Sequence, residues 1–289
     1  MAKLLKGTAF ITGAASGSAT DRKSAQGIGR QTALHFAAAG VQRLVLADVN
    51  ADALAAVSAL VRERHAKDAD ADAEIEVMTL ALDVRDAAAV KQGLESARRR
   101  FGRIDIAVNN AGISGSAKPT HELDEADWLR VTDVLLNGVW RCQKEELAIM
   151  VAQEVPSSSS PPAPQREGRG CIINVASIYG LVAHDAAVAY TAAKHGVVGL
   201  TRADALRYGP QGIRINAIAP GFTETPLLAG AMARSPAAAA AATAHIEKAP
   251  LGRMATAEEI ADCIVFLASP MSSFVHGSVL VADGGYTAG

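Results

Sequence analysis

Tyr190 and Lys194 are the two residues of this sequence whose spacing points most directly to chemistry. They stand four positions apart in a predicted helix, so their side chains share one face. A tyrosine hydroxyl titrates near 10 and is a poor base at neutral pH, but a fixed ammonium beside it favours the phenolate. Lowering that pKa by ~3 takes about 4 kcal/mol. The pair predicts a tyrosine that exchanges a proton with a substrate; an ordinary surface pair is the alternative.

Ser177 adds a second hydroxyl to this candidate site. It lies 13 residues before Tyr190 and follows the predicted strand Cys171–Val175. A hydroxyl there could hold a substrate oxygen while charge develops on it. None of the seven histidines is spaced with a carboxylate or a second histidine for metal binding, so we expect no catalytic metal.

A glycine-rich turn near the N-terminus predicts a phosphate site. Residues 12–17 read TGAASG after a predicted strand, and Gly27, Ile28 and Gly29 open a predicted helix. Glycine lets a backbone approach a pyrophosphate closely, and a helix N-terminus adds partial positive charge. Removing ten residues restores an unbroken TGAASGIGR, so we interpret about 18–27 as an insertion. A glycine-rich turn without a ligand is the alternative.

Polar residues also stand at the ends of the next predicted strands. Asp48 ends the second strand, where a carboxylate can bond ribose hydroxyls and repel a 2′-phosphate; capping the next helix is the alternative. Asp83 and Val84 end the third strand, and Asn109 opens the sequence NNAG at the end of the fourth. Ligands of open parallel sheets gather at these carboxyl ends.

Short β-branched segments alternate with alanine-rich helical patterns along the whole chain. The predicted strands are Thr8–Ile11, Arg43–Ala47, Glu76–Leu82, Ile104–Val108, Cys171–Val175, Arg214–Ile218 and Ser278–Val281. The predicted helices are about Ile28–Ala39, Ala51–Arg64, Asp86–Phe101, Asp124–Gln153, Val188–Tyr208 and Ala257–Ala268. The strands are mostly apolar, as strands buried on both faces should be. This alternation predicts a parallel, doubly wound α/β sheet.

The composition excludes several classes of protein. With 289 residues and a formal charge of −2, electrostatic capture of nucleic acid or of an anionic membrane is not expected. Three separated cysteines fit a reducing compartment, and the first residues do not form a signal peptide. We therefore expect a cytoplasmic protein that acts on a small molecule.

Taken together, these motifs resemble those of the short-chain dehydrogenase/reductase family. The matching pieces are TGAASG…GIG, Asp48, LDV, NNAG, Ser177, the run Tyr190–Lys194 and Pro220-Gly221. The spacing of Ser177 and Tyr190 is also that of the family. The resemblance implies one domain over residues 1–289: a Rossmann fold with a seven-stranded parallel sheet and helices on both faces, usually in a homodimer or homotetramer.

The resemblance also assigns residues to a nicotinamide cofactor. Ser177, Tyr190 and Lys194 would be catalytic. The implied cofactor-binding residues are Gly13, Ser16, Gly17, Ile28, Asp48, Asp83, Val84, Asn109, Ala111, Tyr190, Lys194, Pro220, Thr223 and Thr225. In the family Asp83 would meet the adenine, Asn109 would lie along the cofactor, and Thr225 would lie near the nicotinamide and pyrophosphate.

The type of nicotinamide cofactor depends on charges near the ribose. Asp48 favours NAD(H), because a carboxylate repels a 2′-phosphate. Arg22 and Lys23 in the insertion could reach such a phosphate, which keeps NADP(H) open.

One position departs from the family pattern. The family has an asparagine in the long helix, and alignment on Gly138 places Leu135 at that position. Asn137 lies two residues later, about 200° around a helix, and cannot simply substitute. Leucine there could weaken the proton relay without abolishing hydride transfer, or it could mark a member recruited for non-redox chemistry.

Two further segments complete the interpretation. Residues 153–168 are rich in Pro and Ser and predict a surface excursion, and about 226–250 lies where the family carries its substrate lid. We expect hydride transfer between a nicotinamide cofactor and a secondary alcohol or ketone on a mostly apolar substrate, with Tyr190 as general acid/base. A dehydratase, isomerase or cyclase, or a nucleotide-binding regulator, are the alternatives.

Overall fold

One parallel sheet organises the protein, in a computed structural model that describes residues 3–15, 26–68, 74–155 and 168–289. Its order is β3-β2-β1-β4-β5-β6-β7, and every neighbouring pair runs parallel. The strands are β1 (Thr8–Thr12), β2 (Arg43–Asp48), β3 (Glu76–Ala81), β4 (Ile106–Asn109), β5 (Gly170–Val175), β6 (Ile213–Pro220) and β7 (Val279–Ala282). The predicted seven-stranded, doubly wound sheet is confirmed.

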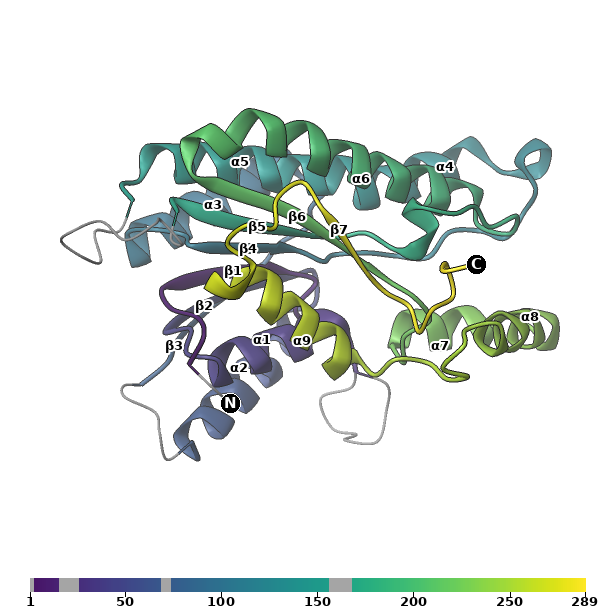
Figure 1. The fold of residues 1–289 in the computed structure, drawn as a ribbon, viewed down its shortest axis with the longest axis horizontal. Coiled ribbons are helices and arrows are strands. Elements are labelled where there is room, and N and C mark those ends of the chain that lie inside the picture. The colour runs from purple at the N-terminus through teal and green to yellow at the C-terminus, as the bar shows by residue number, and fades with distance from the viewer. Residues whose placement is uncertain (1–2, 16–25, 69–73, 156–167) are drawn as a thin grey trace.

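Helices cover both faces of this sheet (Figure 1). One face carries α3 (Ala87–Phe101), α4 (Glu125–Thr132), α5 (Gly138–Ala152) and α6 (Val188–Tyr208). The other face carries α1 (Ile28–Ala38), α2 (Ala51–Ala66) and α9 (Ala257–Ala268). Two shorter helices, α7 (Pro226–Met232) and α8 (Pro236–Glu247), follow β6 and lie beyond the carboxyl edge of the sheet.

The strand sequences build an apolar layer on each side of the sheet. Successive side chains of a strand point to opposite faces. Phe10 of β1 and Ile172 of β5 belong to the layer under α3, α5 and α6, whereas their neighbours Ile11 and Ile173 belong to the layer under α1, α2 and α9. The central strands are buried on both faces as expected, but the edge strands β3 and β7 are partly exposed.

The predicted helix over about Asp124–Gln153 is confirmed in extent, because helical residues run without a break from Glu125 to Ala152. The sequence did not predict the π-helical turn, Asp133–Asn137, that separates α4 from α5 within it. Arg141 of α5 holds this turn, because its guanidinium Nη2 lies 2.7 Å from Asp133 Oδ1. Such a turn widens the helix by one residue and is common at functional sites.

The two predicted insertions lie mostly outside the described residues. For the insertion at about 18–27, only Gln26 and Gly27 are described. For the predicted excursion at 153–168, residues 153–155 and 168 are described. Gln153, which follows α5, bonds the backbone of Ile104 and Arg169. The Arg169 guanidinium in turn donates to the carbonyl oxygens of Val151 and Gln153.

Candidate active site

Ser177 lies just beyond the carboxyl end of β5. It caps a single 3₁₀ turn, Ile178–Gly180, and its Oγ accepts a hydrogen bond of 3.2 Å from the N–H of Tyr179. The residue is only 8% exposed. The cap fixes the Ser177 hydroxyl at the edge of the sheet where ligands of parallel α/β folds bind.

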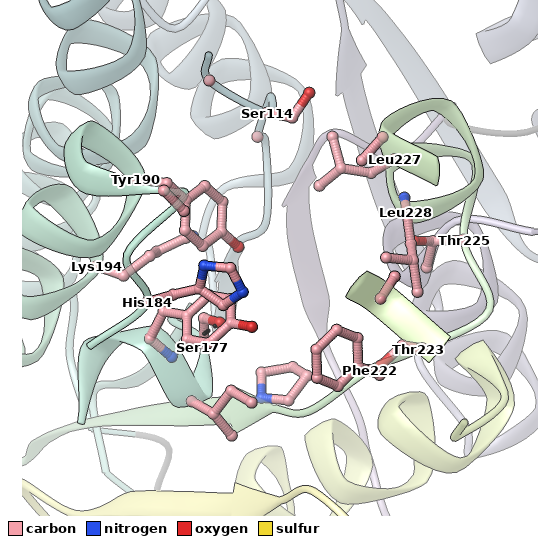
Figure 2. Close-up of a pocket in the computed structure, with 18 of the residues that line it drawn as sticks. Ser114, Ser177, His184, Tyr190, Lys194, Phe222, Thr223, Thr225, Leu227 and Leu228 are labelled. Carbon is pink, nitrogen blue, oxygen red and sulfur yellow. Dashed lines mark hydrogen bonds between the residues drawn. The ribbon is translucent and has the colours of Figure 1, made fainter. Parts of the chain in front are cut away.

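The long helix α6 brings Tyr190 and Lys194 to the same place (Figure 2). The Tyr190 side chain lies beside Ser177, and both line the same cavity. Lys194 Nζ lies 5.7 Å from the centre of the Tyr190 ring and donates a bond of 2.6 Å to the carbonyl oxygen of Val175. The structure therefore gathers the three predicted catalytic side chains into one cluster.

Burial sets the electrostatics of this cluster. It raises the pKa of Tyr190 above its usual value, and the neighbouring Ser177 side chain opposes that rise. Burial also lowers the pKa of Lys194 to about 8. At neutral pH the protein without a ligand holds a protonated tyrosine beside a lysine that is still charged. This is the state of a proton donor.

The turn after β1 has no room for side chains at two glycines. Gly13 has a φ of +64°, and a Cβ there would lie 2.8 Å from Ala111 Cα. A Cβ on Gly29 would lie 2.3 Å from the carbonyl oxygen of Gly13, to which Asn110 Nδ2 donates a bond of 3.0 Å. Gly27, the N-cap of α1, has no side chain to occupy the first N–H groups of the helix. This bare backbone fits a pyrophosphate.

Asp48 lies at the end of β2, directly against the glycine-rich turn. Its Oδ2 accepts a hydrogen bond of 3.0 Å from the N–H of Ala15, and Oδ1 accepts one of 3.1 Å from the N–H of Asn50. The cap of α2 is Asn50, whose Oδ1 accepts from the N–H of Ala53. The capping alternative for Asp48 is therefore wrong, and its carboxylate fits a ribose next to the turn.

A cavity of about 350 Å³ opens beside the catalytic cluster. Much of its wall is apolar, with leucines, a methionine and several alanines of α7 and α8 opposite Tyr190 (Figure 2). The predicted site residues that line it are Ile28, Ser177, Tyr190, Lys194, Pro220, Thr223 and Thr225. The cavity has the size of a small-molecule site.

The other predicted cofactor residues lie apart from this cavity. Asp83 pairs with Arg85 at 2.6 Å, and this hydrogen bond lowers the pKa of the Asp83 carboxyl. Val84 is buried in the apolar layer, and the N–H of Ala111 donates 3.1 Å to Thr12 Oγ1. Gly13 and Asp48 lie at the turn described above. The predicted Ser16 and Gly17 lie outside the described residues.

The side chain of Asn109 is directed into the interior. It is 2% exposed, and its Nδ2 donates bonds of 3.0 Å to Glu146 Oε2 and to Asn174 Oδ1. Asn174 continues inward to Gln143 Oε1 at 2.7 Å and to Thr201 Oγ1 at 2.9 Å. Any contact of Asn109 with a cofactor is thus left to its main chain. This buried network was not predicted from the sequence. The polar Asn174 in an otherwise apolar strand could have indicated it.

Leu135 occupies the π-helical turn and lines the cavity. Its side chain is fully buried, whereas Asn137 is exposed and donates a bond of 3.1 Å to Asp133 Oδ1. Asn137 therefore does not reach the site, in agreement with the angle expected from the sequence. An apolar side chain stands beside the catalytic cluster at this position.

The helices α7 and α8 lie in the predicted lid segment and close one side of the cavity. Leu227 and Leu228 of α7 face the side that carries Tyr190 (Figure 2). Between the two helices, the Arg234 guanidinium donates 2.6 Å to the carbonyl oxygen of Gly115 and 2.5 Å to Ser114 Oγ. Arg234 thereby ties this segment to the loop after β4.

The parallel sheet with helices on both faces and the glycine-rich turn after β1 define a single-domain α/β protein of the Rossmann type, and Ser177, Tyr190 and Lys194 lie together at the carboxyl edge of its sheet. A family model described as enoyl-(acyl carrier protein) reductase matches residues 23–287. The cis-4-hydroxycyclohexanecarboxylate dehydrogenase of Sinomonas cyclohexanicum is 40% identical over 280 residues, which is 97% of this chain and 96% of that protein. The cyclohexanol dehydrogenase of Acinetobacter sp. (strain SE19) is 37% identical over 279 residues, covering 96% of this chain and 94% of that one.

The solved structure of levodione reductase is similar over the whole fold. It matches with a TM-score of 0.82 and 37% identity, and covers 98% of both chains. The chain belongs to the short-chain dehydrogenase/reductase family. That family uses nicotinamide cofactors, NAD(H) or NADP(H). Within the described ranges, no helix is long and apolar enough to cross a membrane.

Proposed function

We propose that this protein is a nicotinamide-dependent oxidoreductase that interconverts a secondary alcohol and a ketone on a mostly apolar, cyclic substrate. The observation that carries the proposal is the Ser177–Tyr190–Lys194 cluster at the wall of a small, largely apolar cavity. The names of two relatives, which refer to a hydroxycyclohexane acid and to cyclohexanol, support a six-membered ring as the substrate.

The proposed mechanism assigns a role to each of the three side chains. The Ser177 hydroxyl holds the substrate oxygen, and Tyr190 Oη gives its proton to that oxygen when a ketone is reduced. The Lys194 ammonium stabilises the phenolate that remains. The bound nicotinamide supplies or accepts the hydride. In the direction of oxidation Tyr190 takes the proton back, so oxidation is favoured as the pH rises.

We assign the cofactor to the glycine turn and the strand ends around it. The backbone of Gly13 and the start of α1 at Ile28 would hold the pyrophosphate, together with Ser16 and Gly17, and Asp48 would hold the adenosine ribose. The remaining residues assigned to the cofactor are Asp83, Val84, Asn109, Ala111, Tyr190, Lys194, Pro220, Thr223 and Thr225. We also expect a homodimer or homotetramer, which light scattering of the purified protein would test. The expected location is the cytoplasm.

A substrate panel tests the function itself. Cyclohexanols, cyclohexanones and open-chain alcohols are offered with each cofactor, and the absorbance at the nicotinamide band is followed. We expect turnover of the cyclic compounds with balanced change of the cofactor. A product of altered mass without net oxidation of the cofactor would instead assign the site to dehydration or isomerisation.

The Asp48 carboxylate predicts a preference for NAD(H). We expect kcat/KM to be higher with NADH than with NADPH, because a 2′-phosphate would meet this negative charge. Replacing Asp48→Ser should reduce the ratio of the two values roughly 10- to 100-fold, the effect of one charged hydrogen bond. Asp52→Ser, at the exposed start of α2, removes the same charge nearby and serves as the control. A wild-type preference for NADPH contradicts the assignment.

A further inference from the structure

A row of ring side chains joins the C-terminal segment to the catalytic tyrosine through α8. Tyr286 contributes its hydroxyl, 2.7 Å from Nδ1 of His245 on α8. The His245 ring lies 4.8 Å from the ring of His184, which lies 4.7 Å from Tyr179. The Tyr179 ring lies 6.4 Å from that of Tyr190. Every distance here joins ring centres except the first. A second route runs through Phe222, whose ring lies 6.0 Å from that of His245 and 6.4 Å from that of Tyr179.

The lid segment, which we define as α7 and α8 with the residues between them, is therefore held at two places. Arg234 ties it to Ser114 and Gly115 on one rim of the cavity. His245 ties it to His184 on the other rim, and His184 lines the cavity whereas His245 does not. The two contacts differ chemically, because a guanidinium stays charged at all ordinary pH values and an imidazole does not.

The surroundings of His245 disfavour its positive charge. Burial lowers the pKa of this imidazole, the neighbouring His184 lowers it further, and Lys248, the residue after α8, does the same. Asp185 is the one acidic group that acts in the opposite direction, and its side chain is fully exposed beside His184. Tyr286 offers a neutral hydroxyl, and the Phe222 ring stacks on His245 at 6.0 Å without any charge.

We propose that His245 is a positioning residue that docks the lid segment on His184, and that this contact holds while the His245 imidazole is neutral. The inference rests on the proposed function only in taking the cavity as the substrate site. The contact between the His245 and His184 rings does not depend on that function. A proton on His245 adds a charge to a partly buried ring that faces His184 and Lys248, so protonation favours the state in which α8 has moved away. The lid segment then releases substrate more readily as the pH falls through the range in which His245 takes up this proton.

The expected kinetic effect falls on substrate binding. As the pH falls from 7.5 to 5.5, KM for the alcohol or ketone rises by at least fivefold, while kcat at saturating substrate follows Tyr190 alone. One linked proton limits the change to tenfold per pH unit.

The test compares His245→Phe with a control on the other rim. Phenylalanine keeps a ring against Phe222 and His184 but takes no proton, so we expect its KM to differ by less than twofold between pH 7.5 and 5.5. Arg234→Ala removes the other contact and should raise KM at both pH values while keeping the wild-type ratio between them. A His245→Phe enzyme that retains the wild-type pH ratio overturns the proposal.

Hydrogen exchange of wild-type protein gives a readout that does not depend on turnover. Amides of residues 236–247 should exchange faster at pH 5.5 than at pH 7.5, after correction for the intrinsic rate, and those of α9 should not. Equal corrected rates in 236–247 overturn the inference. Absence of turnover on every substrate, with the exchange result intact, would contradict the proposed function alone.

Discussion

Replacing Tyr190 with phenylalanine should lower kcat about 10³-fold, within the usual range for loss of a general acid or base. The substitution removes one oxygen atom and leaves the ring that packs near Tyr179 and Lys194. Ser177 remains fixed by the N–H of Tyr179. The chemistry is lost because the variant has no hydroxyl on this ring to give a proton to the substrate oxygen.

The measurement is steady-state turnover of a cyclic ketone with NADH or NADPH, paired with calorimetric titration of the cofactor. We expect cofactor affinity within a few-fold of wild type, which separates proton transfer from binding. Tyr208→Phe is the matched control, because Tyr208 ends the same helix about 27 Å further along its axis. Residual activity within tenfold of wild type would remove Tyr190 from the mechanism.

Replacing Glu146 with glutamine should stabilise the protein, and by an amount that grows with pH. Glu146 of α5 is fully buried, its Oε2 accepts 3.0 Å from Asn109, and burial raises its pKa from 4.5 to about 8. In the unfolded chain this carboxyl ionises above about 4.5, whereas in the folded protein it stays protonated up to about 8. The contribution of Glu146 to the free energy of unfolding is therefore fully present below pH 4.5 and is lost as the pH rises to about 8.

The rise of the Glu146 pKa from 4.5 to about 8 corresponds to about 5 kcal/mol of unfolding free energy at 1.36 kcal/mol per pH unit. Glutamine resembles the protonated acid and does not titrate, so the variant keeps this contribution. Urea unfolding at pH 5, 6, 7 and 8 measures the difference between variant and wild type. Glu145→Gln, the neighbouring and more exposed position, should show little change with pH. A difference between Glu146→Gln and wild type that stays constant across this range would contradict the prediction.

Much of the fold follows from local pattern in the sequence. The central strands are mostly apolar, and polar or glycine residues follow closely at their carboxyl ends, so both the parallel sheet and its carboxyl edge could be predicted. Ser177, Tyr190 and Lys194 could also be predicted as a cluster from local patterns in the sequence. Two of them share one face of a helix, and the third caps the 3₁₀ turn after β5, against which that helix packs.

The features that were missed depend on contacts between distant segments. The π-helical turn at Leu135 interrupts a sequence with good helical periodicity, and its stabilising partner Arg141 gives no local sign of that role. The family resemblance implied that Asn109 lies along the cofactor, but no local pattern indicated that its side chain bonds Glu146 and Asn174 in the interior. His245 meets His184 from 61 residues away, beyond any periodic pattern.

The hydrogen bonds that fix Gln153 and Arg169 have a practical consequence. These residues join the end of α5 to the start of β5, at the amino edge of the sheet and therefore opposite the catalytic cluster. Lengthening a connection between two fixed ends adds only a small closure entropy. The segment between them is thus an attachment point: an affinity tag, a fluorophore or a whole reporter domain inserted there would leave the chemistry at the carboxyl edge untouched.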